Sequence, residues 1–93
     1  MKKFFIIILD PNSDSTLVRA KIGELGDYYN IYNNQYLVCL DCDNAQELYN
    51  KLQPNNISPV GIVIFGASIE GLTYWGYSDK GLWAWLQTHL NTH

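Results

Sequence analysis

The stretch FFIIILDP, residues 4–11, decides how this chain folds, because it is an unbroken apolar run that stops at Asp10-Pro11. A strand that is apolar on both faces belongs in the middle of a sheet, covered on both sides. Pro11 has no N–H to donate to a neighbouring strand, so the strand ends there with Asp10 at its carboxyl tip. Small α/β proteins often place a metal or a ligand at such a tip. Asp10 is therefore the candidate residue for binding a metal or a ligand.

The next segments read as a helix and a hairpin. Cap-forming residues at 12–16 precede an apolar stripe at helical spacing, which comprises Leu17, Val18, Ile22 and Leu25, and Gly26 is a natural stop. Residues 28–32 and 35–41 are rich in β-forming side chains and flank Asn33-Asn34, which favours a two-residue turn. In the second arm Tyr36, Val38 and Leu40 share one face, while Leu37 and Cys39 share the other.

The second half repeats this alternation. Asp43 with Gln46 forms a predicted capping box for a helix whose apolar stripe is Ala45, Leu48, Tyr49 and Leu52. Residues 60–65 predict a second strand buried on both faces, and residues 72–77 a short extra strand. Ser78 or Asp79 would cap a last helix with Leu82, Trp83, Leu86 and Leu90 on one stripe and Trp85 off it.

This order predicts an α+β fold, a ferredoxin-like βαββαβ sandwich with an additional C-terminal short strand and helix. Residues 1–93 are expected to form a single domain. Right-handed crossovers place the first two helices on the same face of the sheet, which leaves the other face open. Apolar strands beneath an open face need a cover, either the C-terminal helix or a second subunit, so we expect a homodimer.

Composition limits the function classes. The chain has a formal net charge of −3 and a single arginine, which disfavours nucleic-acid binding because that needs clustered Lys and Arg. Three Trp, seven Tyr and three Phe are many aromatics for so small a chain and favour a subunit contact. The apolar run after Lys2-Lys3 is too short for a signal peptide or a membrane span, so we expect a cytoplasmic protein without a membrane partner.

The chain resembles the small SinR-like and CRISPR-associated protein two-like family of ferredoxin-like dimers. The resemblance rests on the strand ending in Asp10, the aromatic segment 28–32, Trp75-Gly76 and the Trp85-Leu86 helix. It implies a metal-dependent endonuclease, acting on RNA or DNA, in which Asp10 from each subunit holds Mg²⁺ or Mn²⁺. Arg19 and Lys21, on the first helix, match the region where the family carries basic residues and would contact phosphate. The acidic, arginine-poor composition departs from that family.

Three further patterns have structural alternatives. Asp10, as an Asp before Pro, is also a typical turn or cap residue. Cys39 and Cys42 form a C-x-x-C pair, but two thiols alone do not make a zinc site, and buried reduced cysteines are the simpler interpretation. Tyr74, Trp75, Tyr77 and Trp85 are expected at a dimer or partner interface. The alternative function is therefore a non-catalytic protein–protein interaction module that keeps the fold without nuclease activity.

Overall fold

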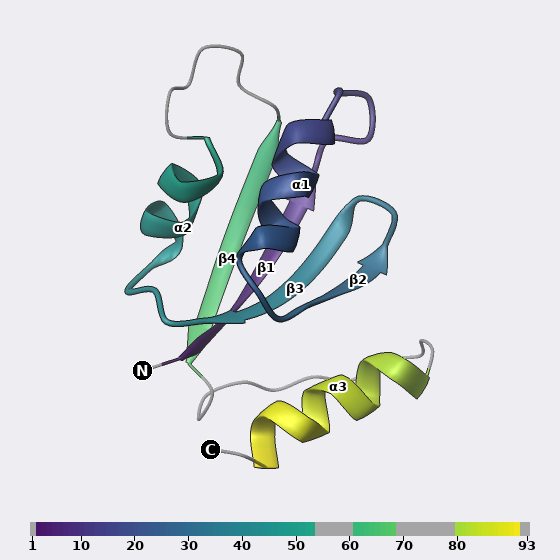
Figure 1. The fold of residues 1–93 in the computed structure, drawn as a ribbon, viewed down its shortest axis with the longest axis vertical. Coiled ribbons are helices and arrows are strands. Elements are labelled where there is room, and N and C mark those ends of the chain that lie inside the picture. Colours follow the sequence, from purple (N-terminus) through teal and green to yellow (C-terminus); the bar gives the residue numbers. More distant parts are fainter. Residues whose placement is uncertain (1, 54–60, 69–79, 92–93) are drawn as a thin grey trace.

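The computed structural model describes residues 2–53, 61–68 and 80–91, which contain a four-stranded antiparallel sheet and three helices (Figure 1). The elements follow one another as β1 (Lys3–Leu9), α1 (Thr16–Glu24), β2 (Tyr28–Tyr32), β3 (Gln35–Leu40), α2 (Ala45–Leu52), β4 (Ile62–Ser68) and α3 (Lys80–Asn91). Within the sheet the strands lie in the order β2-β3-β1-β4. The predicted α+β class and the inner position of β1 are both confirmed.

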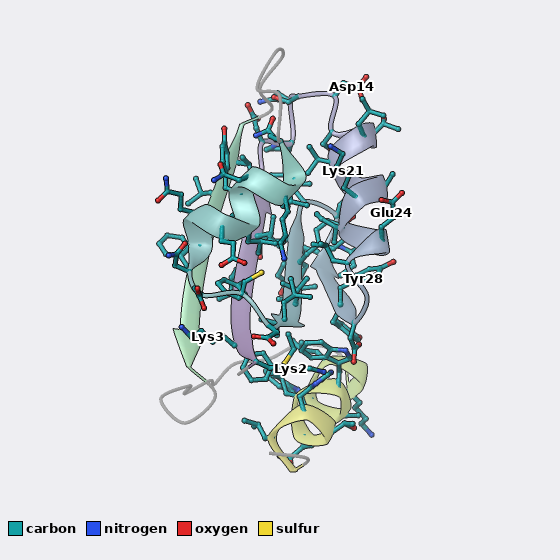
Figure 2. All side chains as sticks on the ribbon, turned by 60° about the vertical axis from the view of Figure 1, so that its left-hand side comes forward. Lys2, Lys3, Asp14, Lys21, Glu24 and Tyr28 are labelled. Carbon is teal, nitrogen blue, oxygen red and sulfur yellow. The ribbon has the colours of Figure 1, made fainter. Side chains whose placement is uncertain are left out.

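One face of the sheet is covered by α1 and α2, which lie on the same side of it in Figure 2, as predicted. Alternation along β1 turns Phe5, Ile7 and Leu9 toward these helices, and all three are essentially inaccessible to solvent. They pack against Val18 and Ile22 of α1 and against the buried leucines of α2. Leu17, expected on the same stripe, is instead 80% exposed, because the N-terminal turn of α1 presents Val18 to the sheet.

The opposite face is covered in part by α3, which lies across one end of the sheet in Figure 1. Leu82 and Leu86 of this helix pack on Phe4, Leu37 and Cys39 to form a second core. Of the two predicted covers for the open face, the C-terminal helix and a second subunit, the helix thus covers this end. Trp85, expected off the apolar stripe, is partly buried in the same core.

The second apolar strand differs from its prediction. β4 covers residues 62–68 and lies at the edge of the sheet, with only β1 beside it among the described strands. Val63 is 52% exposed and Phe65 is 58% exposed, so the strand is not buried on both faces. An apolar run reports the preference of its side chains for burial, but it carries no information about which neighbours the chain brings to each side.

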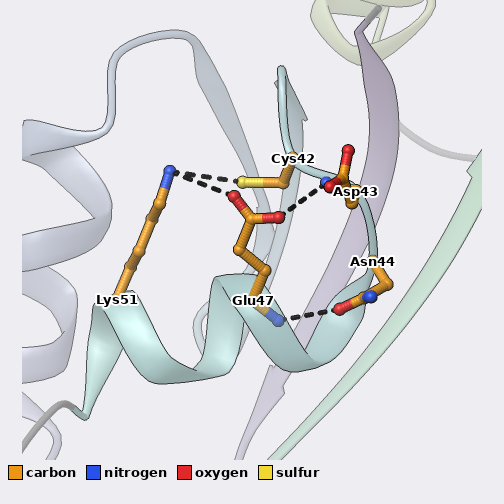
Figure 3. A network of polar contacts seen from close by, with 5 residues as sticks. All are labelled: Cys42, Asp43, Asn44, Glu47 and Lys51. Atoms are coloured by element: carbon orange, nitrogen blue, oxygen red, sulfur yellow. Dashed lines mark hydrogen bonds and ion pairs between the residues drawn. The ribbon is translucent and has the colours of Figure 1, made fainter.

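The cap of α2 lies one residue later than predicted (Figure 3). The Asn44 side chain accepts a hydrogen bond from the Glu47 N–H at 2.9 Å, and the Glu47 carboxylate accepts one from the Asp43 N–H at 2.9 Å. Asn44, rather than Asp43, is therefore the N-cap, and Glu47 rather than Gln46 reaches back to the start of the helix, where it bonds the N–H of the residue before the cap. Both pairs have suitable side chains, so the point where the chain leaves β3 selects between them.

Several predictions lie outside the described residues. The extra strand at 72–77 belongs to this group, as do Tyr74, Trp75 and Tyr77 and the cap of the last helix at Ser78 or Asp79. Among the residues that are described, no helix has the length and apolar character needed to cross a bilayer.

Candidate functional site

The tip of β1 is held rigidly by its two neighbours in the sheet. The Asp10 N–H donates to the Gly61 carbonyl at 2.8 Å, which continues the pairing of β1 with β4. On the other side, the Leu9 N–H donates to the backbone carbonyl of Asn34 at 2.8 Å, and the side-chain amide of Asn34 donates to the Leu9 carbonyl at 3.1 Å. Asp10 therefore lies at the predicted strand tip, on a fixed backbone, with its side chain exposed.

Both oxygens of the Asp10 carboxylate accept local hydrogen bonds. Oδ1 accepts from the Asn12 N–H at 2.9 Å, and Oδ2 accepts from the Ser13 hydroxyl at 3.2 Å. The Ser13 N–H also donates to the Asp10 carbonyl at 3.1 Å, so the carboxylate and the backbone together close the turn after β1. This arrangement is the structural alternative for Asp10, an Asx turn that connects β1 to α1.

The surface beside Asp10 is a shallow depression of about 290 Å³, lined by Ile8, Leu9, Asp10, Pro11, Asn34, Gly61, Ile62 and Val63. Its floor is tight at Gly61, where an added Cβ would lie 2.7 Å from the Asp10 Cβ. Across residues 2–53, 61–68 and 80–91, no group of three or more His, Cys, Asp or Glu side chains gathers as a metal site. Asp10 is thus the single acidic side chain lining this depression among the described residues.

Asp14, the next carboxylate along the chain, belongs to the start of α1. Its Oδ1 accepts from the Thr16 hydroxyl at 2.7 Å and from the Thr16 N–H at 3.2 Å. The hydroxyl bond first, and then the backbone bond, hold the pKa of the Asp14 carboxyl below its usual range. In Figure 2 this side chain projects from the loop that precedes α1. Asp14 therefore has its own structural partner in Thr16.

Arg19, one of the two predicted phosphate-binding residues, connects α1 to the β2–β3 hairpin. Its Nε donates to the Ser15 hydroxyl at 2.8 Å, and one terminal nitrogen donates to the Asn33 carbonyl at 2.6 Å and to the Tyr36 hydroxyl at 2.9 Å. The guanidinium also lies 5.8 Å from the Tyr36 ring centre. Lys21, the other predicted residue, lies in the last turn of α1, where a cation stabilises the helix dipole.

Trp85 is the one predicted interface aromatic within the described residues, and it makes several contacts inside the chain. Its indole Nε1 donates to Asp27 Oδ1 at 2.8 Å, and His89 Nε2 lies 2.7 Å from Asp27 Oδ2. The indole also packs edge-on against Phe4, with ring centres 6.0 Å apart, and is 4.2 Å from the His89 ring. Asp27 thus joins the segment before β2 to α3, a contact that sequence reasoning missed.

The uncovered part of the sheet carries a group of apolar side chains, three exposed and one (Ile8) partly buried, that we call the open-face strip: Ile6, Ile8, Val63 and Phe65. Ile6 pairs with Phe65 and Ile8 pairs with Val63 across β1 and β4, so the four side chains point to the same face. Ile6 is 37% exposed, and Val63 and Phe65 are more than half exposed. Sequence reasoning assigned these residues to the core, whereas the structure places them on the part of the sheet face that α3 does not cover.

The two cysteines lie in different cores. Cys39 faces α3 and Cys42 faces α2, so the C-x-x-C pair is split across the sheet and both thiols are free and buried, as predicted. Burial raises the pKa of the Cys39 thiol. Cys42 Sγ lies 3.6 Å from Lys51 Nζ, which also approaches Glu47 at 3.9 Å (Figure 3).

Comparison with known proteins assigns no family. No family model, no curated protein and no solved structure matches the chain.

Proposed function

We propose that this protein is a non-catalytic protein-interaction module that associates through the open-face strip and the adjoining strand β4. The main observation behind this proposal is that Val63 and Phe65 are 52% and 58% exposed. They lie beside Ile6 on a part of the sheet face that no described residues cover. Monomeric proteins rarely expose large contiguous groups of apolar side chains, and such groups commonly mark protein interaction sites. The strip consists of aliphatic and aromatic groups, so its partner is a protein surface of matching apolar character.

The proposed arrangement of the domain is ferredoxin-like. Two observations support it: the strand order β2-β3-β1-β4 with antiparallel neighbours, and the placement of α1 and α2 on one face. In such a domain the other face of the sheet is free to bind, and here α3 occupies only the end of it near Phe4 and Leu37. Free thiols at Cys39 and Cys42 support a reducing, cytoplasmic location.

The chemistry-bearing residues support an interaction module more than an enzyme. Both oxygens of Asp10 accept bonds from its own turn, and the Arg19 guanidinium is bound to the hairpin. A net charge of −3 opposes the approach of a phosphate backbone. Each of these groups already has a structural role within the chain.

A metal-dependent nuclease is the second candidate, favoured by one observation. Asp10 is exposed at the rim of the depression beside Gly61, where an ion could reach it from solvent. Mg²⁺ or Mn²⁺ would bind there through one carboxylate and several waters, with substrate phosphate completing the shell. The ion would compete with Asn12 and Ser13 for the two carboxylate oxygens.

Amide NMR during a Mn²⁺ titration separates the two candidates. The interaction module predicts no selective broadening at Asp10 relative to Asp14, an exposed carboxylate four residues away that serves as the internal reference. A nuclease predicts broadening at Asp10 that Asp10→Asn abolishes, together with cleavage of labelled RNA or DNA that the same variant loses. Cleavage that depends on Asp10 would overturn the proposed function.

Photo-crosslinking tests the interaction directly. We expect a photoreactive phenylalanine analogue at position 65 to crosslink to protein in the native host, whether that protein is this chain or another. The same analogue at Tyr32, which is 57% exposed at the opposite edge of the sheet, is the matched control. Equal crosslinking at both positions, or none at position 65, would contradict an interaction site on β4.

A further inference from the structure

The outer edge of β4 presents hydrogen-bonding groups in a defined pattern. The Asp10 N–H bonds to the Gly61 carbonyl, so residues at odd positions from 61 onward direct their N–H and C=O toward β1. Ile62, Ile64 and Gly66 therefore direct theirs outward. Among the described residues, no strand pairs with this edge, since the sheet ends at β4.

Among the described residues, β4 lacks the features that proteins use to protect an edge strand. It has the sequence IVIFGAS over seven residues, without a charge or a proline, and its register with β1 is regular throughout. The opposite edge, β2, is protected. It has five residues and an irregular register between Asn30 and Tyr32, and the Asn30 amide already donates to the Tyr32 carbonyl at 2.6 Å.

We infer that the outer edge of β4 pairs antiparallel with β4 of a second copy of this chain, about a two-fold axis at Phe65. This inference rests on the proposed function and names the partner. A second copy of this edge is a suitable partner, because the strand has no charged residue. Two copies therefore pair without charge repulsion, and the strand does not require a partner of opposite charge. Full overlap of residues 62–68 places Phe65 opposite the partner's Phe65, and the outward groups of Ile64 opposite those of the partner's Gly66.

This pairing closes after two copies. An isologous contact uses the same edge in both molecules, and the protected β2 edge ends the joined sheet on either side. The side chains of Val63 and Phe65 gain apolar neighbours across the new strand pair. The two Asp10 residues, each beside Gly61, are kept apart: eight residues of strand at about 3.3 Å each separate the two Gly61 positions by roughly 26 Å. This dimer therefore cannot bring both carboxylates to one ion.

Sedimentation velocity over a concentration series tests the pairing. We expect the wild type to dimerise and Phe65→Lys to weaken the dimer by about tenfold or more, because two like charges would lie directly opposite each other. Tyr32→Lys, a change of equal chemistry and similar exposure on the β2 edge, should leave the dimer intact. A wild type that stays monomeric at every concentration, or equal weakening by both variants, would overturn the inference.

Amide hydrogen exchange identifies which surface is used. Edge pairing predicts that the N–H groups of Ile62, Ile64 and Gly66 become protected on dimerisation and are released in Phe65→Lys. A dimer that leaves these amides unprotected uses another surface, such as the open face, and contradicts the pairing. Monomeric protein that still crosslinks at position 65 to another protein would refute the inference and leave the proposed function standing.

Discussion

Replacing Asp27 with alanine should loosen α3 from the sheet, because this one carboxylate contacts two side chains of that helix. Oδ1 accepts from the Trp85 indole at 2.8 Å, and Oδ2 lies 2.7 Å from His89 Nε2. The variant removes both contacts at once. The packing of Trp85 on Phe4 remains in the variant, and α3 should stay attached by its leucines.

The expected loss is about 1–2 kcal/mol in the free energy of unfolding. A hydrogen bond to a charged group contributes roughly 1.5–3 kcal/mol when both partners are buried. The Asp27 side chain is 55% exposed, so solvent screening reduces that figure, while His89 at 12% exposure retains more of it. Glu24→Ala removes an exposed charge at the end of α1 and is the control, with an expected effect within about 0.5 kcal/mol.

Urea unfolding followed by circular dichroism measures these changes without relying on tryptophan emission. A double-mutant cycle with Trp85→Phe, which deletes the indole N–H and keeps an aromatic ring, should give a coupling of about 0.5–1.5 kcal/mol between positions 27 and 85. A coupling below about 0.3 kcal/mol would show that the indole bond does not stabilise the fold, and would refute the role assigned to Asp27.

Three further predictions concern groups with a defined structural partner. In a Cys42→Ala background, the Cys39 thiol should react slowly with a disulfide reagent, because it is buried and its pKa is raised. Asp27→Ala should accelerate this reaction by loosening α3. An unchanged rate would show that α3 does not shield the Cys39 thiol. Thr16→Val should raise the pKa of Asp14 toward its ordinary value in an NMR titration. Because the folded pKa is lowered, the contact stabilises the fold above the ordinary carboxyl range and is lost as pH falls through the lowered pKa; an unmoved titration would contradict this. Arg19→Lys should cost about 1–3 kcal/mol in urea unfolding despite keeping the charge, since an ammonium cannot span the three acceptors; a change under about 0.5 kcal/mol would leave Arg19 free for the predicted phosphate contact.

The candidate site was only partly accessible from sequence. The position of Asp10 at a strand tip follows from the apolar run and Pro11, and the structure confirms it. The contact between Asp27 and Trp85 joins residues 58 positions apart, and no local sequence pattern predicts it. The exposure of Phe65 could not be predicted either, because the apolar pattern of a strand is the same whether or not another element covers its face.

By itself, the sequence determined where the described helices and strands of this protein form. Side-chain periodicity and the cap and turn residues act over a few positions, so the stripes of α1 and α2 and the Asn33-Asn34 turn are local consequences of the chain. Tertiary structure alone decided that β4 is an edge strand and that α3 covers only one end of the open face. Both outcomes depend on which segments, distant in sequence, pack against each other, and this packing is determined by the whole domain rather than by local sequence.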